Sequence, residues 1–248
     1  MYCYIYDEFV SDKRFEKDLL LVENRLTDLG IAGKIVRLAL FRDPQEMVRD
    51  EIRRGIKNII VVGNDLTTRK VIDLVADTAV TFGMIPMGEE TTLAKIFGVP
   101  AGVAACDVLS ARIIETIDMG HINTRRFMGG VHAENFIGSV ACAGGSFRLT
   151  PERAAVLDIF NLALAPDRET APDPRDGLLD LTLTVPVKSG WGIFKRSKMG
   201  VTRWKDKQFV IEGETELMVD GEILKGNRFE IGIVPGVLKV ITGKGRVF

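Results

Sequence analysis

The first 120 residues alternate between strand-like and helix-like segments, and this alternation limits the fold more than any other feature of the chain. Apolar residues recur at helical spacing over 12–30, 43–55 and 66–80. β-prone runs separate these helices, namely YCYIY (2–6), KIVRLAL (34–40), NIIVVG (58–63) and GMIPMG (83–88). Repeated strand–helix units predict an α/β domain with a mostly parallel sheet covered by helices.

From about residue 121 the pattern changes to short strands separated by turns. Strand-like runs lie at RFMGGVHAENFIGSVAC (126–142), LLDLTLTVPV (178–187), KQFVIEGETELMVDGEIL (207–224) and RFEIGIV (228–234). This pattern is typical of an antiparallel β-sandwich or barrel. Residues 151–165 fit a helix or a strand, and we favour a strand from Ala155.

The composition of the chain limits the kinds of partner that it is expected to bind. A net charge of −1 over 248 residues gives no reason to expect nucleic acid. The three cysteines, Cys3, Cys106 and Cys142, lack CxxC spacing, which speaks against zinc and disulfides and fits the cytoplasm. No apolar run approaches the ~20 residues that span a bilayer. We therefore expect any action on lipid to occur from the membrane surface, at its inner face.

The segment Gly63-Asn64-Asp65-Leu66-Thr67 joins a buried strand to a helix and has two interpretations. In the first interpretation it is a phosphate loop, in which backbone N–H groups and the Thr67 hydroxyl face phosphate and Asp65 acts through magnesium. In the second it is the start of a helix that is capped by Asn64, Asp65 or Thr67.

A second strand–glycine–helix junction follows at Ile85–Pro100, with Gly88 at its turn. Two such junctions on one sheet favour a nucleotide site at the carboxyl ends of the strands. Glu89 and Glu90, however, would repel a polyphosphate unless a metal ion or a basic residue intervened.

Acidic residues of the second half also have two interpretations each. Asp220-Gly221 between apolar runs predicts a hairpin, although Glu222 or Asp220 would also serve to remove a proton from a hydroxyl. Asp173 and Asp176 lie in a turn-like stretch, but would also suit a hard cation. The basic stretch Lys188–Lys207, with Trp191, Phe194 and Trp204, suggests a solvated hairpin or a contact with an anionic membrane.

The order of these segments resembles the diacylglycerol kinase catalytic family, especially its bacterial soluble lipid kinases. GNDLT is similar to the family's GGDGT loop, with Asn64 and Leu66 in place of two glycines. Residues 86–95, PMGEETTLAK, resemble PLGTGNDFAR. APDPRDGLLDL is similar to APxAxxDGLLDV, and VDGEI falls on the family's DGE motif. The resemblance runs from about residue 56 to the end, because YDEFVSD stands where the family has an Asn-Pro motif.

The resemblance implies a three-layer α/β domain over residues 1–120, rejoined by 236–248, and a β-sandwich over 121–235. It implies ATP-dependent, Mg²⁺-dependent phosphorylation of a diacylglycerol-type hydroxyl, nucleotide and lipid as partners, and a homodimer. The implied catalytic residues are Glu222, Asp220 and Asp65. Implied nucleotide contacts are Gly63, Asn64, Thr67, Gly88, Thr91 and Thr92, and implied magnesium ligands are Asp173, Asp176 and Leu178.

Two alternatives stay open on the sequence. The altered loops suit a catalytically inactive nucleotide- or lipid-binding module on the same fold, because Leu66 places a side chain where phosphate needs bare backbone. A kinase of the NAD kinase type, acting on a small soluble molecule, is the second alternative.

Overall fold

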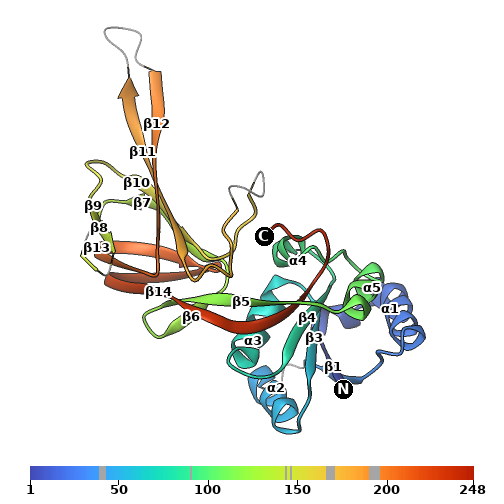
Figure 1. Ribbon diagram of the computed structural model, residues 1–248. Coiled ribbons are helices and arrows are strands. Elements are labelled where there is room, and N and C mark those ends of the chain that lie inside the picture. The colour runs from blue at the N-terminus through green and yellow to red at the C-terminus, as the bar shows by residue number, and fades with distance from the viewer. Residues whose placement is uncertain (39–42, 90, 143, 146, 166–170, 190–195) are drawn as a thin grey trace. The chain divides into compact units, whose positions relative to one another are not determined.

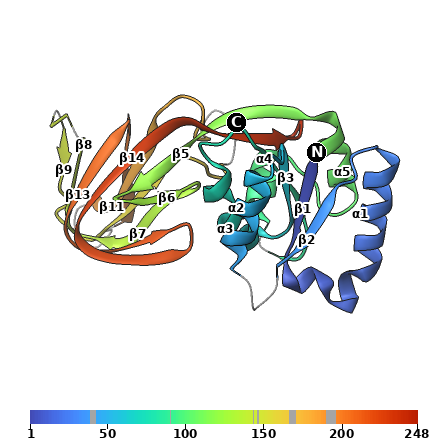
Figure 2. The same ribbon diagram turned by 90° about the horizontal axis from the view of Figure 1, so that it is seen from below.

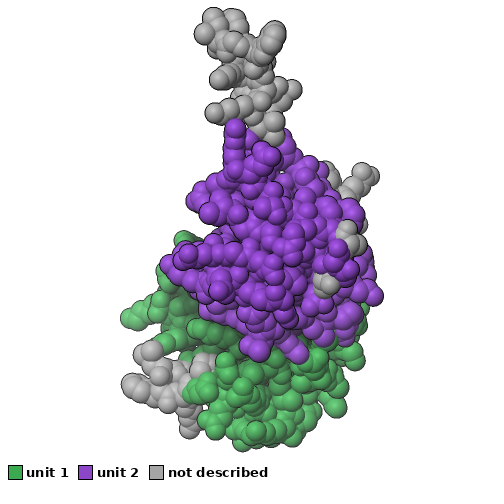
Figure 3. Space-filling model, turned by 90° about the vertical axis from the view of Figure 1, so that its left-hand side faces the viewer, with its two compact units in different colours: residues 1–117, 164–169, 237–248 green, residues 118–163, 170–236 purple. Residues whose placement is uncertain are grey.

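The computed structural model describes residues 1–38, 43–89, 91–142, 144–145, 147–165, 171–189 and 196–248. Glu90, Trp191 and Phe194, which the sequence analysis singled out, lie outside the described residues. The chain divides into two compact units, shown in different colours in Figure 3. Unit 1 comprises Met1–Ile117, Leu164–Glu169 and Val237–Phe248, and unit 2 comprises Asp118–Ala163 and Thr170–Gly236.

Unit 1 is built on a parallel sheet with the strand order β2-β1-β3-β4-β14. Its strands are β1 (Tyr2–Tyr6), β2 (Lys34–Arg37), β3 (Asn58–Gly63), β4 (Thr81–Pro86) and the end of β14 (Glu222–Thr242). Every residue of β3 and β4 is buried, as the continuous apolar runs of central parallel strands require. The predicted parallel sheet is therefore confirmed.

Helices cover both faces of this sheet, giving three layers. In Figures 1 and 2, α1 and α5 lie on one face, and α2 and α3 lie on the other. The helices are η1 (Glu8–Ser11), η2 (Lys13–Phe15), α1 (Glu16–Asp28), α2 (Pro44–Arg53), α3 (Asp65–Val75), α4 (Thr92–Phe97) and α5 (Ala104–Ala111). Within the described part of the chain, no helix has the length and apolar character needed to cross a bilayer.

Local signals explain where most of these helices begin and end. The Asp43 carboxylate accepts a hydrogen bond from the Gln45 N–H at the start of α2, and Gly30 follows α1 with a φ of +68°. α3 is shorter than the predicted 66–80. It ends at Val75 because Asp77 has a φ of +59° and the Thr78 hydroxyl donates to the Val75 carbonyl.

Unit 2 is an antiparallel assembly with the strand order β12-β11-β10-β7-β13-β14 and with β8 and β9 paired beside β13. Its strands enclose one hydrophobic core. The strands are β6 (Arg125–Phe127), β7 (Gly130–Phe136), β8 (Ser139–Cys142), β9 (Arg148–Leu149), β10 (Ala155–Phe160), β11 (Leu179–Ser189), β12 (Arg196–Asp206) and β13 (Gln208–Val219). The strand expected from Ala155 is confirmed as β10.

The chain passes between the units inside two long strands. β5 (Ile113–Ile122) begins in unit 1 and pairs with β6 in unit 2. β14 pairs with β13 in unit 2, and its last residues, from Val237, pair with β4 in unit 1. The predicted domain boundaries at residues 120 and 236 stay predictions, since a compact unit is not by itself an independently folding domain.

Candidate functional site

The two predicted loops of unit 1 meet around one hollow at the carboxyl end of the parallel sheet. The hollow has a volume of about 590 Å³, and Asn64, Leu66, Gly88 and Glu89 line it. Its other lining residues come from the segment after β1, namely Phe9, Arg14, Phe15 and Asp18. The structure therefore brings the candidates Asn64 and Gly88 together, at the edge where parallel sheets bind ligands.

Asn64 caps helix α3 with its own side chain. The Asn64 Oδ1 atom accepts hydrogen bonds from the N–H groups of Leu66, at 3.1 Å, and of Thr67, at 3.2 Å. These are first-turn donors of the kind that bind phosphate at a helix N-terminus. The capped interpretation of this loop is confirmed for Asn64, and the cap occupies two donors that a phosphate would use.

Asp65 and Thr67 point inward and fasten neighbouring elements. Asp65 is buried, with an exposed fraction of 4%. Its two carboxylate oxygens accept a hydrogen bond from the Leu93 N–H, at 3.2 and 3.3 Å. The Thr67 hydroxyl donates to Asp7, at the end of β1, and to Asn64 at 3.2 Å. Asp65 therefore links α3 to α4, and Thr67 links α3 to β1.

Gly63 and Gly88 both allow a close approach. A Cβ atom at Gly63 would lie 2.8 Å from the Thr67 hydroxyl oxygen. Gly88 has a φ of +77°, and a Cβ atom there would lie 2.9 Å from the Phe9 ring. The other two candidates of this loop lie at the start of α4: Thr91 is its N-cap residue, without a capping side-chain bond, and Thr92 is its first residue.

Aromatic and apolar groups dominate one side of the hollow. Phe9 and Phe15 pack edge to face with ring centroids 5.5 Å apart, and the Arg14 guanidinium lies 4.8 Å from the Phe15 centroid. The Leu66 residue is 48% exposed. The two rings and the Leu66 side chain thus give this side of the hollow an apolar surface. The phosphate end fits poorly as it stands, because Asn64 occupies the N–H donors and Glu89 adds negative charge.

In unit 2, the Asp220 carboxylate holds a loop in place. Asp220 and Gly221 form the turn of the β13–β14 hairpin, with φ values of +47° and +87°, which confirms the hairpin interpretation. The Asp220 oxygens accept from the N–H groups of Met128 at 2.8 Å, Gly129 at 2.9 Å and Gly130 at 3.1 Å. Met128 and Gly129 connect β6 to β7 and Gly130 is the first residue of β7, so this carboxylate has a clear structural function.

Glu222 is the first residue of β14 and is open to solvent. Its side chain is 68% exposed, and its Oε2 atom lies 2.5 Å from a guanidinium nitrogen of Arg125 on β6. An accessible carboxylate is suited to accept a proton from a substrate hydroxyl. Arg125, whose side chain is 40% exposed, forms an ion pair with it.

The acidic loop before β11 contains the three predicted magnesium ligands, Asp173, Asp176 and Leu178. Arg175 makes a two-point ion pair with Asp173, at 2.8 and 3.0 Å, and these hydrogen bonds lower the pKa of the Asp173 carboxyl. Asp176 accepts from the Leu178 N–H at 2.9 Å and from the Lys205 ammonium at 3.2 Å. Positive side chains therefore already satisfy both carboxylates.

The Asp176 carboxylate, which the resemblance assigns to magnesium together with carbonyl groups near Asp173 and Leu178, already has a cationic partner. The Lys205 ammonium lies between Asp176 and Asp180, where a magnesium ion would need oxygen ligands in near-octahedral geometry. No group of three or more His, Cys, Asp or Glu side chains suited to a metal ion occurs among the residues that the structure describes. The magnesium ligands stay a prediction.

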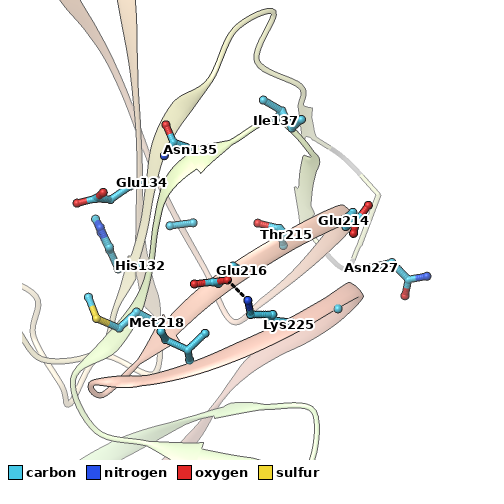
Figure 4. Close-up of a pocket in the computed structure, with 13 residues that line it drawn as sticks. His132, Glu134, Asn135, Ile137, Glu214, Thr215, Glu216, Met218, Lys225 and Asn227 are labelled. Carbon is cyan, nitrogen blue, oxygen red and sulfur yellow. Dashed lines mark ion pairs between the residues drawn. The ribbon is translucent and has the colours of Figure 1, made fainter.

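A second hollow, of about 1110 Å³, lies on unit 2 and is shown in Figure 4. Glu134, Ile137, Glu216, Met218, Ile223 and Lys225 are among its lining residues. Glu222 does not line it. Successive residues of a strand face opposite sides, so Ile223 faces this hollow while its neighbour Glu222 faces away. The hollow is thus separate from the predicted proton acceptor.

Several residues of these sites escaped the sequence analysis. Asp7 and Phe9 lie in the segment that lacks the family's Asn-Pro motif, and Phe15 lies just after it. The position of Asp7 directly after a strand was the available signal. Arg125 and Lys205 had no local signal, because their carboxylate partners lie 97 and 29 residues away in the chain, counted from Glu222 and Asp176.

Fold and candidate site together describe a two-unit α/β and antiparallel β protein, in which the α/β unit carries two loops around a hollow and the antiparallel unit carries an exposed acidic hairpin. Residues 2–122 match the family model of the diacylglycerol kinase catalytic domain. The predicted resemblance to this family is thereby confirmed. The match also corrects its extent, because it includes residues 2–55, where we expected no resemblance. It ends at residue 122, so the resemblance of the later segments, which contain Asp176, Asp220 and Glu222, stays a prediction.

Known relatives agree with this assignment. Two curated proteins of Mycobacterium tuberculosis, strains CDC 1551 / Oshkosh and ATCC 25618 / H37Rv, are named diacylglycerol kinase and are 29% identical over 104 residues. The aligned region is 41% of this chain and 32% of theirs, so it spans about a third of these relatives.

Solved structures show the same fold over the whole chain. A diacylglycerol kinase from Bacillus anthracis str. Sterne matches with a TM-score of 0.77 at 16% identity, covering 98% of this chain and 97% of that one. A second structure from the same organism matches with a TM-score of 0.79 at 17% identity and the same coverage.

Proposed function

We propose that the protein is a lipid kinase that transfers phosphate from ATP to a diacylglycerol-type hydroxyl. The observation that carries the proposal is the match of residues 2–122 to the diacylglycerol kinase catalytic domain. The two loops of that segment lie around one hollow in unit 1, which supports a nucleotide site there. Lipid as the acceptor, ATP as the donor and magnesium as the metal belong to the proposal.

Unit 1 would hold the nucleotide through its own side chains. ATP supplies the phosphoryl group when bound. Phe9 and Phe15 offer the surface for the base, and Gly63 and Gly88 let the backbone come close. Rotation of the Asn64 carboxamide would free the two N–H groups that it now satisfies. Asp65 keeps the α3 and α4 loops in register through its bond to Leu93.

Unit 2 would supply the proton acceptor. In this proposal the Glu222 carboxylate takes the proton of the attacking hydroxyl, as a general base does. Arg125 holds the carboxylate in place. Asp220 shapes the hairpin by binding the backbone of residues 128–130. We assign Asp220 a positioning function rather than proton transfer, because its oxygens already accept three hydrogen bonds.

A phosphate-transfer assay tests this proposal. The chain is incubated with labelled ATP and magnesium in mixed micelles of diacylglycerol, and lipid phosphate is separated and counted. Glu222→Gln should lose at least about a hundredfold in rate, the usual scale for a general base. Glu214→Gln changes another exposed glutamate of unit 2 and should keep the rate. No lipid phosphate above background over a panel of lipids and nucleotides would refute the proposal, and NAD as an acceptor tests the NAD kinase alternative.

A second candidate function is a non-phosphorylating binding module. The observation in its favour is the occupied phosphate loop, where Asn64 satisfies the N–H groups and Leu66 projects a side chain. Calorimetric titration with Mg-ATP separates the two candidates. A bound ligand raises native-state stability by about 2.7 kcal/mol at a hundred times its Kd, so a melting temperature that is unchanged at millimolar ATP would favour the module.

Contact with a membrane surface and a homodimer are further parts of the proposal. Met199 and Val201 on β12 are exposed apolar residues on the same strand face as the exposed Arg203, a combination suited to an anionic surface. Sedimentation with vesicles containing phosphatidylglycerol tests the first, and light scattering over a range of concentrations tests the second.

A further inference from the structure

The side chain of Lys205 lies between two carboxylates of unit 2. Lys205 on β12 is the direct cross-strand partner of Asp180 on β11. Its ammonium nitrogen lies 3.1 Å from Asp180 Oδ2 and 3.2 Å from Asp176 Oδ2. The strand register therefore fixes the ammonium at the point where the acidic loop joins the sheet.

Both contacts of the Lys205 ammonium are ion pairs with carboxylates that are themselves mostly shielded from water. The Asp176 and Asp180 side chains are 28% and 27% exposed, and the Lys205 side chain is 46% exposed. An ammonium has three donors and no acceptor, so two carboxylates are suitable partners.

The loop backbone is fastened without any metal ion. The Asp118 carboxylate accepts from the Gly177 N–H at 2.9 Å, and the Asp118 N–H donates to the Pro174 carbonyl at 2.7 Å. The Asp176 N–H donates to the Asp173 carbonyl at 3.3 Å, and the Asp173 carboxylate is paired with Arg175. The Asp173 and Pro174 carbonyls and the Asp173 and Asp176 carboxylates thus already have partners within the protein.

We propose that the Lys205 ammonium is the permanent cation of this loop and replaces a divalent metal ion that the acidic residues would otherwise bind. The carboxylates of Asp176 and Asp180 need a positive charge between them, because two anions at one point repel each other. Lys205 supplies it from within the chain. The loop therefore keeps its structure in the absence of divalent cations, independently of any kinase activity.

The test compares thermal unfolding with and without divalent cations, with no nucleotide present. For the unaltered chain, the melting temperature should be the same in EDTA and in millimolar Ca²⁺ or Mg²⁺. Lys205→Ala should lower it by roughly 2–4 °C in EDTA. Millimolar Ca²⁺ should restore most of that loss, because the ion then occupies the space between Asp176 and Asp180. Calorimetry should show saturable Ca²⁺ binding to Lys205→Ala.

Lys225→Ala is the matched control. Lys225 also forms an ion pair in unit 2, at 2.6 Å from Glu216, but with that one carboxylate, so its removal should create no response to Ca²⁺. A Ca²⁺-dependent shift of the unaltered chain would overturn the proposal, as would a folded Lys205→Ala that does not respond to Ca²⁺. If Lys205→Ala does not fold, the unaltered chain decides: saturable Ca²⁺ binding that Asp176→Asn abolishes refutes the proposal, and its absence supports it.

Discussion

At the scale of single residues, the Asn64 side chain bears directly on the proposed nucleotide site. Its carboxamide gives α3 a good N-cap and, by the same two hydrogen bonds, removes the N–H donors of Leu66 and Thr67 from the hollow. A glycine at this position would leave both donors free. One side chain therefore couples the stability of the helix to the capacity of the loop for phosphate.

Asn64→Gly should bind Mg-ATP about tenfold more tightly than the unaltered chain. The two freed N–H donors each contribute about 1 kcal/mol, and the cost of ordering the phosphate reduces this sum to about the 1.4 kcal/mol that corresponds to tenfold. The expected loss of stability is a few tenths of a kcal/mol, since glycine is an acceptable N-cap. Calorimetric titration measures the Kd. Asn64→Asp keeps a cap but adds negative charge, so it should weaken binding. Equal affinity of all three proteins would contradict this account.

Asp220 offers a second residue-scale prediction, on stability rather than activity. Asp220→Ala removes the acceptor of the N–H groups of Met128, Gly129 and Gly130 and should lower the free energy of unfolding by about 2–3 kcal/mol. Urea denaturation followed by circular dichroism measures it. Glu214→Ala, at an exposed position, should stay within about 0.5 kcal/mol. A stability of Asp220→Ala equal to that of this control would show that the carboxylate does not hold the loop.

Residue identity was predictable from the sequence, whereas the partners of each residue were not. The motifs pointed to Asp65 and Asp220 as chemical groups, yet both carboxylates accept backbone N–H bonds from segments 28 and 90–92 residues away. Only the folded chain brings such donors to a carboxylate. The catalytic functions of Asp65 and Glu222 therefore stay predictions, and the phosphate-transfer assay with Glu222→Gln tests the second of them.

At the scale of elements, β1 carries a set of buried titratable groups. Burial raises the pKa of the Cys3 thiol from 9.0 to about 11, and burial also raises the pKa values of Tyr4 and Tyr6. In each case the folded state favours the protonated form. The unfolded chain releases these protons at lower pH, so folding is progressively penalised once the pH exceeds the unfolded value.

These groups should therefore not change the free energy of unfolding below pH 9, and they should lower it as the pH rises from 9 towards 11. Urea midpoints measured between pH 7 and pH 10.5 test this. Cys3→Val replaces one titrating side chain of β1 with an apolar side chain of similar size. The free energy of unfolding of this variant should therefore fall less steeply over the same pH range than that of the unaltered chain. A stability that is constant or that increases above pH 9 would contradict the burial of these groups.

Elements with strong local signals were predictable, and those set by tertiary contacts were less so. The start of α2 followed from Asp43 and Pro44, and the hairpin at Asp220-Gly221 followed from its turn residues. The end of α3 did not, because the helical apolar pattern continues past Val75 while the Asp77 backbone turns away. Asp77 donates its N–H to the Val237 carbonyl, a long-range bond that no local pattern records.

At the scale of the whole molecule, the chain completes unit 1 only with its last residues. The end of β14 pairs with β4 at Lys239 and Val240, on the side of β4 opposite to β3. Beyond it, Gly243 donates to the Phe97 carbonyl and Val247 donates to the Ile96 carbonyl at the end of α4. Leu238, Val240 and Ile241 are almost fully buried. A segment from the far end of the sequence therefore closes the core of the first unit.

Deletion of residues 237–248 should consequently destabilise unit 1. It exposes a row of N–H and C=O groups on β4 and removes several buried apolar side chains, each worth about 1.5–3 kcal/mol when fully buried. The sum is comparable to the 5–15 kcal/mol stability of a whole domain, so the peptides of β3 and β4 should exchange their amide hydrogens rapidly. Hydrogen-exchange mass spectrometry measures this amide exchange separately for the peptides of each unit.

Phe248→Ala is the control. It keeps the strand and loses an edge-to-face contact with Phe97, so it should leave β3 and β4 protected. If the truncated chain also kept that protection, unit 1 would fold without β14, and the dependence on the end of the chain would be disproved.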